Sequence, residues 1–249
     1  MSNYQQLLSN FELLGLHKMK EYFPNYLEVV NKKTIPFTEA LLELTHNEID
    51  FRAETKIKRA IEKSRFPKLS RLNEFEFGFQ PSINKKEVLD LAHMSFLSKH
   101  ENIIFIGNPG VGKSHLATGI GIEACQQGVR TLFINCQELL QKLQTAYEKG
   151  TIERVMKRYT HYDLLIIDEI GYLPIQKNEA HLLFQLINAR YELHSTIFTT
   201  NTPLSGWGEV FKNPTVTAAI LDRLVHHSHI IRITGKSYRL KNHGLTQTN

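Results

Sequence analysis

The chain has 249 residues, 41% of them hydrophobic and 22% charged, which is typical of a soluble globular protein with room for one α/β core and a small accessory domain. No stretch approaches the roughly 18 apolar residues of a membrane-spanning helix, and Met1–Asn10 lacks the apolar core of an export signal. Cys125 and Cys136 lie in apolar surroundings and are interpreted as buried thiols, so a cytoplasmic protein with no membrane partner is expected.

The N-terminal part of the chain has the apolar spacing of helices. Residues 1 to 66 follow this spacing, with a connection at Asn31–Pro36. A long helix is predicted to begin near Thr38, a favourable N-cap, and to run through Ile61. Pro67 ends it, and the segment 75–81 is aromatic and irregular. We therefore predict a small all-helical N-terminal domain at residues 1–75 and a second domain at 76–249.

The formal net charge of +5 is concentrated at the end of this helical region. Eight basic residues stand there against only Glu54 and Glu62, so the rest of the chain sums to about −1. A local basic stripe of this kind predicts contact with a polyanion such as DNA, and a solvated helix face is the alternative. The basic residues are Arg52, Lys56, Lys58, Arg59, Lys63, Arg65, Lys68 and Arg71.

From Ser82 onward, helices alternate with short apolar strands. The predicted strands are Asn102–Ile106, Thr131–Ile134, Leu164–Ile167, Thr196–Thr200 and His229–Ile233. The predicted helices are Ser82–Lys99, with Ser82 as its cap, and then Gly112–Gln127, Gln137–Tyr147, Glu179–Leu193 and Thr215–His227. Apolar strands separated by helices predict an α/β fold whose five-stranded parallel sheet is covered on both faces.

A phosphate-binding motif follows the first predicted strand. The pattern G-x-x-x-x-G-K-[ST] is matched at every fixed position by Gly107, Asn108, Pro109, Gly110, Val111, Gly112, Lys113 and Ser114. The glycines let backbone N–H groups surround phosphate oxygens, and the following helix adds a partial positive charge. Lys113 is expected to contact the β- and γ-phosphates of ATP and Ser114 to ligate Mg²⁺. His115 borders this nucleotide site and is expected to pack or cap.

Two carboxylates end the third predicted strand. Asp168 is expected to hold Mg²⁺ and Glu169 to polarise the attacking water, as in a Walker B motif. A P-loop kinase that phosphorylates a small molecule does not need this glutamate. The pair therefore favours an enzyme that hydrolyses ATP over a kinase.

Polar residues elsewhere are candidates for completing the site. Asn201 follows the fourth strand and is predicted to orient water against the γ-phosphate, with a turn before Pro203 as the alternative. The candidates for stabilising transition-state charge are Arg190, Arg223 and Arg239. His226, His227 and His229 are interpreted as structural or surface histidines, because adjacent residues on a helix point in different directions.

With these residues in hand, the chain resembles the IstB family of AAA+ helper ATPases of bacterial insertion sequences, and more distantly the helicase loader DnaC. The first two matching segments are shared by many P-loop ATPases, whereas the last two are more specific to IstB-like proteins. The segments are GNPGVGKSHLATGIG (107–121), LLIIDEIGYLP (164–174), LFQLINARYE (183–192), TTNTPLSGWGEVF (199–211) and AAILDRLVHHSHIIRITGKSYRLK (218–241).

This resemblance implies a P-loop AAA+ ATPase that forms homo-oligomers on duplex DNA, with weak sequence preference, and assists a partner transposase in transposition. Within the family pattern, Asn201 matches sensor 1 and Arg223 matches the arginine that reaches a neighbour's nucleotide. Because few residues follow Arg239, a full helical lid is not expected, and Arg239 is expected to supply a reduced sensor 2. The alternative function that the resemblance leaves open is a DnaC-like helicase loader in DNA replication.

Overall fold

A computed structural model describes residues 2–32 and 35–241 of the chain. Contacts divide it into two compact units, Met1–Arg59 and Ala60–Asn249. Composition suggested a boundary at residue 75, so the two divisions differ in residues 60–75. In the structure, this stretch belongs to the second unit, where the ring of Phe66 contacts that of Phe133 edge-on.

The first unit is built from α1 (Asn3–Leu13), α2 (His17–Asn31) and most of α3 (Phe37–Lys63). Gly15, at φ 65°, separates α1 from α2, a break that apolar spacing alone did not reveal. The helix α3 begins at Phe37, directly after Pro36, so the prediction of Thr38 as its cap was wrong. The core of the unit is small, and its hydrophobic cluster has Phe11, Met19 and Leu44 as its buried members among the described residues.

A buried carboxylate joins two helices of the first unit. Glu48 on α3 accepts hydrogen bonds from the backbone N–H groups of Lys18 at 2.7 Å and Met19 at 3.3 Å, and from Arg52 Nε at 2.8 Å. It thereby caps the first turn of α2, since Leu16 at the N-cap offers no side-chain oxygen. Burial alone would raise the pKa of Glu48, but the bonds from Arg52 and the two backbone groups outweigh burial and lower this pKa.

We expect Glu48→Gln to destabilise α2 by about 1–3 kcal/mol at neutral pH, because charge-assisted hydrogen bonds become neutral ones. The pKa of Glu48 is lower in the folded than in the unfolded chain, so its contribution is present above the unfolded value and is lost as pH falls through the folded value. The measurement is hydrogen exchange of the α2 amides in the full chain. Exposed Asp50, changed to Asn, is the control, and a wild-type advantage that persists unchanged in acid would contradict the prediction.

The second unit contains a five-stranded sheet in the order β2-β3-β4-β1-β5, with every pair of neighbours parallel. The prediction of a five-stranded parallel sheet is therefore confirmed. The strands span β1 (Asn102–Gly107), β2 (Thr131–Asn135), β3 (Leu164–Ile170), β4 (Ser195–Thr200) and β5 (Ser228–Ile233). Because all strands run in one direction, their carboxyl ends meet at one edge of the sheet, where the polar residues singled out above are placed.

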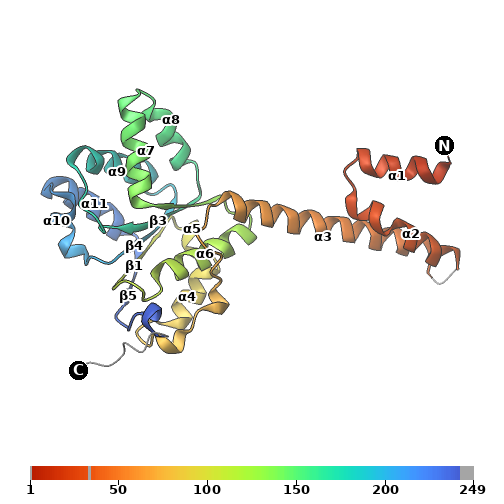
Figure 1. The fold of residues 1–249 in the computed structure, drawn as a ribbon, viewed down its shortest axis with the longest axis horizontal. Helices are drawn as coiled ribbons and strands as arrows, with labels where there is room; N and C mark the ends of the chain where they lie inside the picture. Colours follow the sequence, from red (N-terminus) through yellow and green to blue (C-terminus); the bar gives the residue numbers. More distant parts are fainter. Residues whose placement is uncertain (1, 33–34, 242–249) are drawn as a thin grey trace. The chain divides into compact units, whose positions relative to one another are not determined.

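Helices cover both faces of this sheet, giving three layers (Figure 1). One face carries α7 (Cys136–Glu148), α8 (Ile152–Thr160), α9 (Lys177–Arg190), α10 (Trp207–Phe211) and α11 (Pro214–His226). The other carries α4 (Lys85–Ala92), α5 (Ser95–Ser98) and α6 (Lys113–Gln126). Alternate residues of β1 enter the two cores, Ile104 on the first face and Ile103 on the second. Short 3₁₀ turns lie at Leu72–Glu74, Phe77–Phe79, Leu204–Gly206 and Tyr238–Leu240.

The structure departs from the predicted helices at three places. The helix expected over residues 82–99 is broken at Met94, whose φ of 62° is incompatible with a continuing helix, and Asn84 rather than Ser82 caps α4. The short helices α8 and α10 were missed. In α8, Ile152, Val155, Met156 and Tyr159 pack on the core at the spacing of a helix, so the signal was present but only nine residues long.

The two cysteines are free and buried, as predicted. Burial raises the pKa of the Cys125 thiol, and it raises that of Cys136 to about 12. Both thiols are therefore protonated and unreactive at neutral pH. Among the described helices, none combines the length and apolar character needed to cross a bilayer.

Candidate nucleotide-binding site

The phosphate-binding motif forms the turn between β1 and α6. Gly107 ends β1, and Lys113 is the first residue of α6. Gly110 and Gly112 adopt φ values of 82° and 103°, which residues other than glycine rarely adopt. A Cβ on Gly107 would lie 2.3 Å from the carbonyl oxygen of Ile233, so glycine is required there by close approach. The backbone therefore has the cradle shape that the sequence predicts.

A pocket of about 520 Å³ opens over this turn, a volume in the range of small-molecule sites. Five separate segments of the second unit line it. Residues 109–115, from the turn and the start of α6, form the floor. The stretch 68–80 contributes Lys68, Ser70, Glu74, Phe75, Glu76 and Gln80, and the other three segments contribute Glu169, Tyr172, Asn201, Tyr238 and Arg239. The predicted Glu169 and Asn201 thus lie at the same pocket as the glycine-rich turn.

Lys113 is buried at the pocket floor. Its Nζ donates hydrogen bonds to the carbonyl oxygens of Gly107 at 2.8 Å and Asn108 at 3.0 Å. Burial lowers the pKa of Lys113, and the charge of Arg239 lowers it further, whereas Asp168 and Glu169 oppose the shift. Two cations therefore face the pocket, and an anionic group bound there would relieve their repulsion.

Asp168 lies at the carboxyl end of β3 and is buried. Its Oδ1 accepts hydrogen bonds from Ser114 Oγ at 2.7 Å and from Thr199 Oγ1 at 2.5 Å. The hydroxyl and carboxylate oxygens lie close enough together to ligate the same ion. Oxygen atoms of this kind are the ligands that Mg²⁺ prefers. The residues present therefore fit the predicted metal, and Thr199 is an additional group that fixes the carboxylate.

Glu169 lies in an irregularity of β3, where the pairing with β4 shifts register between Ile167 and Ile170. Its φ is 60°, a conformation that costs a residue with a side chain about 1–2 kcal/mol. Its N–H donates to Thr199 Oγ1 at 2.9 Å, and its Oε2 accepts from Asn135 Nδ2 at 2.8 Å. Backbone and side chain are thus both held by neighbouring strands.

Sequence reasoning missed Thr199 and Asn135. Each is a polar residue near the carboxyl end of a strand adjacent to β3, and Asn135 is the direct register partner of Asp168. The same rule that singled out Asn201 would have found them, had it been applied to every strand end beside the carboxylates. Asn201 itself follows β4 and lines the pocket, its Oδ1 accepting from Thr202 Oγ1 at 3.4 Å.

His115 lines the pocket and packs against the stretch that precedes it in the chain. Its ring meets Phe75 edge-on, with centroids 5.3 Å apart, and its Nε2 donates to the carbonyl oxygen of Arg71 at 2.8 Å. This contact ties the stretch before the pocket to the first turn of α6. It is the packing role that the sequence suggested for His115.

The three candidate arginines lie in different environments. Arg190 is buried and donates to the carbonyl oxygens of Tyr159, Thr160, Tyr162 and Ser195, so its consideration as a catalytic candidate was wrong and it is structural. Arg223 on α11 does not line the pocket. Its Nε donates to Asn188 Oδ1 at 2.8 Å, and its guanidinium lies over the Phe184 ring. Arg239 does line the pocket.

Comparisons with known proteins agree with this geometry. The profile of the family described as "IstB-like ATP binding protein" matches residues 9–246. A protein described as an ATP-binding protein of insertion sequence IS232, from Bacillus thuringiensis subsp. berliner, is 46% identical over 97% of both chains. The corresponding protein of IS21 from Pseudomonas aeruginosa is 38% identical over 97% of this chain and 90% of its own.

Among solved structures, AMPPCP-bound DnaA from Aquifex aeolicus matches with a TM-score of 0.59 and 20% identity. The match covers 74% of this chain and 59% of that one. At this level of identity the likeness concerns the fold alone, and it confirms the predicted P-loop AAA+ fold of the second unit.

Proposed function

Because the chain belongs to the family of IstB-like ATP-binding proteins, we propose that it binds ATP with Mg²⁺, hydrolyses ATP, and uses this cycle to control its assembly on duplex DNA as the helper of a transposase. The observation that carries the proposal is the convergence on one pocket of the glycine-rich turn, Glu169 and Asn201, with Asp168 bonded to Ser114.

In this proposal, Lys113 and the N–H groups of the turn bind the phosphates of ATP. Ser114 and Asp168 would hold Mg²⁺, which supplies charge neutralisation on the phosphate oxygens. Glu169 accepts a proton from the attacking water, and Asn201 orients that water. Asn135 binds Oε2 of Glu169 in this structure, so the second carboxylate oxygen, Oε1, is the one that would take the proton.

The position of Arg223 supports a homo-oligomer. It is held on the α9–α11 surface by Asn188 and Phe184 and is absent from the lining of its own pocket. An arginine so placed acts on a γ-phosphate only if that nucleotide belongs to a neighbouring subunit. Arg239 stands in its own pocket and supplies charge there.

The basic stripe supports contact with DNA. Lys56, Arg59 and Lys63 are exposed and spaced three and four residues apart along α3, so they share one face of that helix. Arg52 differs from them because it is paired with Glu48 and donates to the carbonyl oxygen of Gly15. We therefore propose that the basic residues from Lys56 onward, and not Arg52, contact the phosphates of DNA.

We expect replacement of Lys56, Lys58, Arg59 and Lys63 by Ala to flatten the salt dependence of DNA binding, by about 0.9 in log–log slope for each DNA phosphate that the protein no longer neutralises. The measurement is a gel shift with a non-hydrolysable ATP analogue and duplex DNA over a salt series. Ala at the exposed Lys86, Lys99, Lys149 and Lys177 is the charge-matched control. An unchanged slope would mean that the stripe does not bind DNA, and failure of the wild type to bind DNA with nucleotide would overturn the proposal itself.

The role as a transposase helper is proposed over that of a DnaC-like helicase loader because both relatives described above are named for insertion sequences. The two functions predict different partners. Addition of the protein with ATP should stimulate strand transfer by the transposase of the same element. Stimulation of helicase loading without an effect on strand transfer would favour the alternative.

A further inference from the structure

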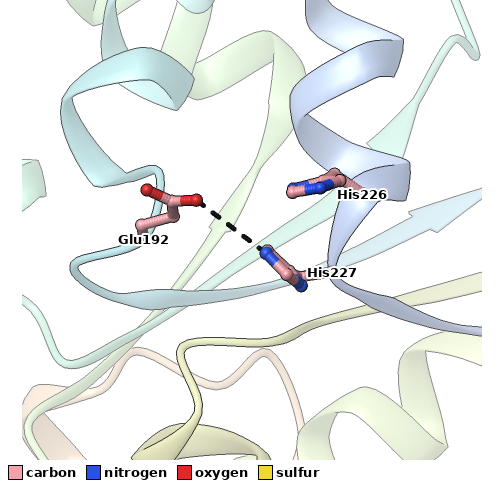
Figure 2. A group of neighbouring side chains, drawn as sticks. All are labelled: Glu192, His226 and His227. Atoms are coloured by element: carbon pink, nitrogen blue, oxygen red, sulfur yellow. Dashed lines mark ion pairs between the residues drawn. The ribbon is translucent and has the colours of Figure 1, made fainter.

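Three side chains of types that can ligate metal ions meet on the surface of the second unit, away from the nucleotide pocket. Glu192 follows α9, His226 is the last residue of α11, and His227 comes directly after it (Figure 2). One ligand atom from each lies within 4.8 Å of the others, and all three residues are exposed. The histidines were interpreted as structural or surface residues on the ground that adjacent residues of a helix point in different directions.

That geometric ground does not hold at His227, which is no longer helical. Its backbone, at φ −131° and ψ 75°, leaves the helix at this residue, so its ring turns toward that of His226. The two ring centroids lie 4.0 Å apart. His229 takes no part, since its Nε2 lies 2.9 Å from a carboxylate oxygen of Glu101. The third member of the group is the carboxylate of Glu192, which is far away in the sequence.

The distances suit a shared metal ion better than a direct bond. Glu192 Oε1 and His227 Nε2 are 3.8 Å apart, too far for a hydrogen bond. Two ligands that are each about 2.0–2.1 Å from one tetrahedral ion lie roughly 3.4 Å apart. Because the side chains are exposed, small rotations bring the three donors to that spacing.

The histidine nearest the helix end also has an orienting partner. His226 Nδ1 lies 2.8 Å from the hydroxyl of Tyr191. A bond of this kind to one ring nitrogen fixes the orientation of the imidazole and leaves the other nitrogen for a metal. Tyr191 and Glu192 come from the same turn, so one segment supplies both a ligand and the residue that positions another.

We propose that Glu192, His226 and His227 form a surface site for a divalent transition metal ion of the zinc class. Two imidazoles and one carboxylate suit Zn²⁺, Ni²⁺ or Cu²⁺, whereas Mg²⁺ prefers oxygen donors alone. This site is therefore chemically distinct from the Mg²⁺ site at Ser114 and Asp168, and it does not depend on ATP hydrolysis. It joins the end of α9 to the end of α11, one turn beyond Arg223.

The test is isothermal titration of the tag-free full chain with Zn²⁺ in excess Mg²⁺, together with the visible spectrum of the Co²⁺ complex. The wild type is expected to bind one equivalent, and Glu192→Gln and His227→Ala to bind at least about tenfold more weakly. His93→Ala, at an exposed histidine elsewhere, should bind like the wild type. Equal affinity in the wild type and both cluster variants, or no uptake by the wild type, would overturn the proposal. Since Glu192→Gln preserves the shape of the side chain, misfolding would not explain its loss of binding.

Discussion

Lys113→Ala is expected to lower the affinity for ATP by about two orders of magnitude or more, equivalent to about 3 kcal/mol. The Lys113 ammonium is buried at the floor of the pocket, where it bonds to two carbonyl oxygens of the turn. Phosphates bound over the turn bring negative charge to a place that water screens poorly, and the alanine variant has no cation there to compensate it. The measurement is equilibrium binding of a fluorescent ATP analogue.

Lys99→Ala, at an exposed lysine before β1, is the matched control and should bind ATP like the wild type. Because Lys113 bonds to the turn itself, thermal unfolding without nucleotide must be compared as well. A Lys113→Ala protein that unfolds like the wild type and still binds ATP with unchanged affinity would remove the phosphate-binding role from this turn.

Much of the fold was predictable because its signals are local. The strands β1, β3 and β4 are short and buried along almost their whole length, and they lie in the interior of a parallel sheet, which requires that pattern. The glycine-rich turn was equally readable, because the conformations of Gly110 and Gly112 are dictated by the chain itself. Helix ends were less predictable. The break at Met94 is marked by neither glycine nor proline, so the local sequence does not reveal it.

Polar residues at strand ends can be found from the sequence, but the bonds that each of them makes in the site could not be predicted, because these bonds depend on neighbours in space. Asn135 bonds to Glu169 across 34 residues of sequence, and Thr199 bonds to Asp168 across 31. Arg190 and Arg223 look alike in the sequence, yet one is buried among carbonyl groups and the other lies at the surface of α11. No local pattern distinguishes such cases, because the partner groups are brought together only by the order of the strands and the packing of helices.

Glu169→Gln is expected to retain ATP binding and to lower turnover by about 10²–10⁴-fold. The amide keeps an oxygen that accepts from Asn135 Nδ2, and the backbone bond to Thr199 is untouched, so the strained conformation at this residue is preserved. What is lost is the ability to take a proton from water. The measurements are steady-state phosphate release and equilibrium binding of ATP, with Glu153→Gln, at an exposed glutamate of α8, as the control.

A variant that binds ATP but does not hydrolyse it should also accumulate the ATP-bound assembly on duplex DNA. Electron microscopy of Glu169→Gln with ATP and DNA is therefore expected to show oligomers that the wild type forms only with a non-hydrolysable analogue. This outcome separates Glu169 from Lys113, since Lys113→Ala removes the nucleotide and with it the assembly. If both variants lost ATP binding to the same extent, Glu169 would be part of the binding site rather than the base, and hydrolysis would need another residue to activate water.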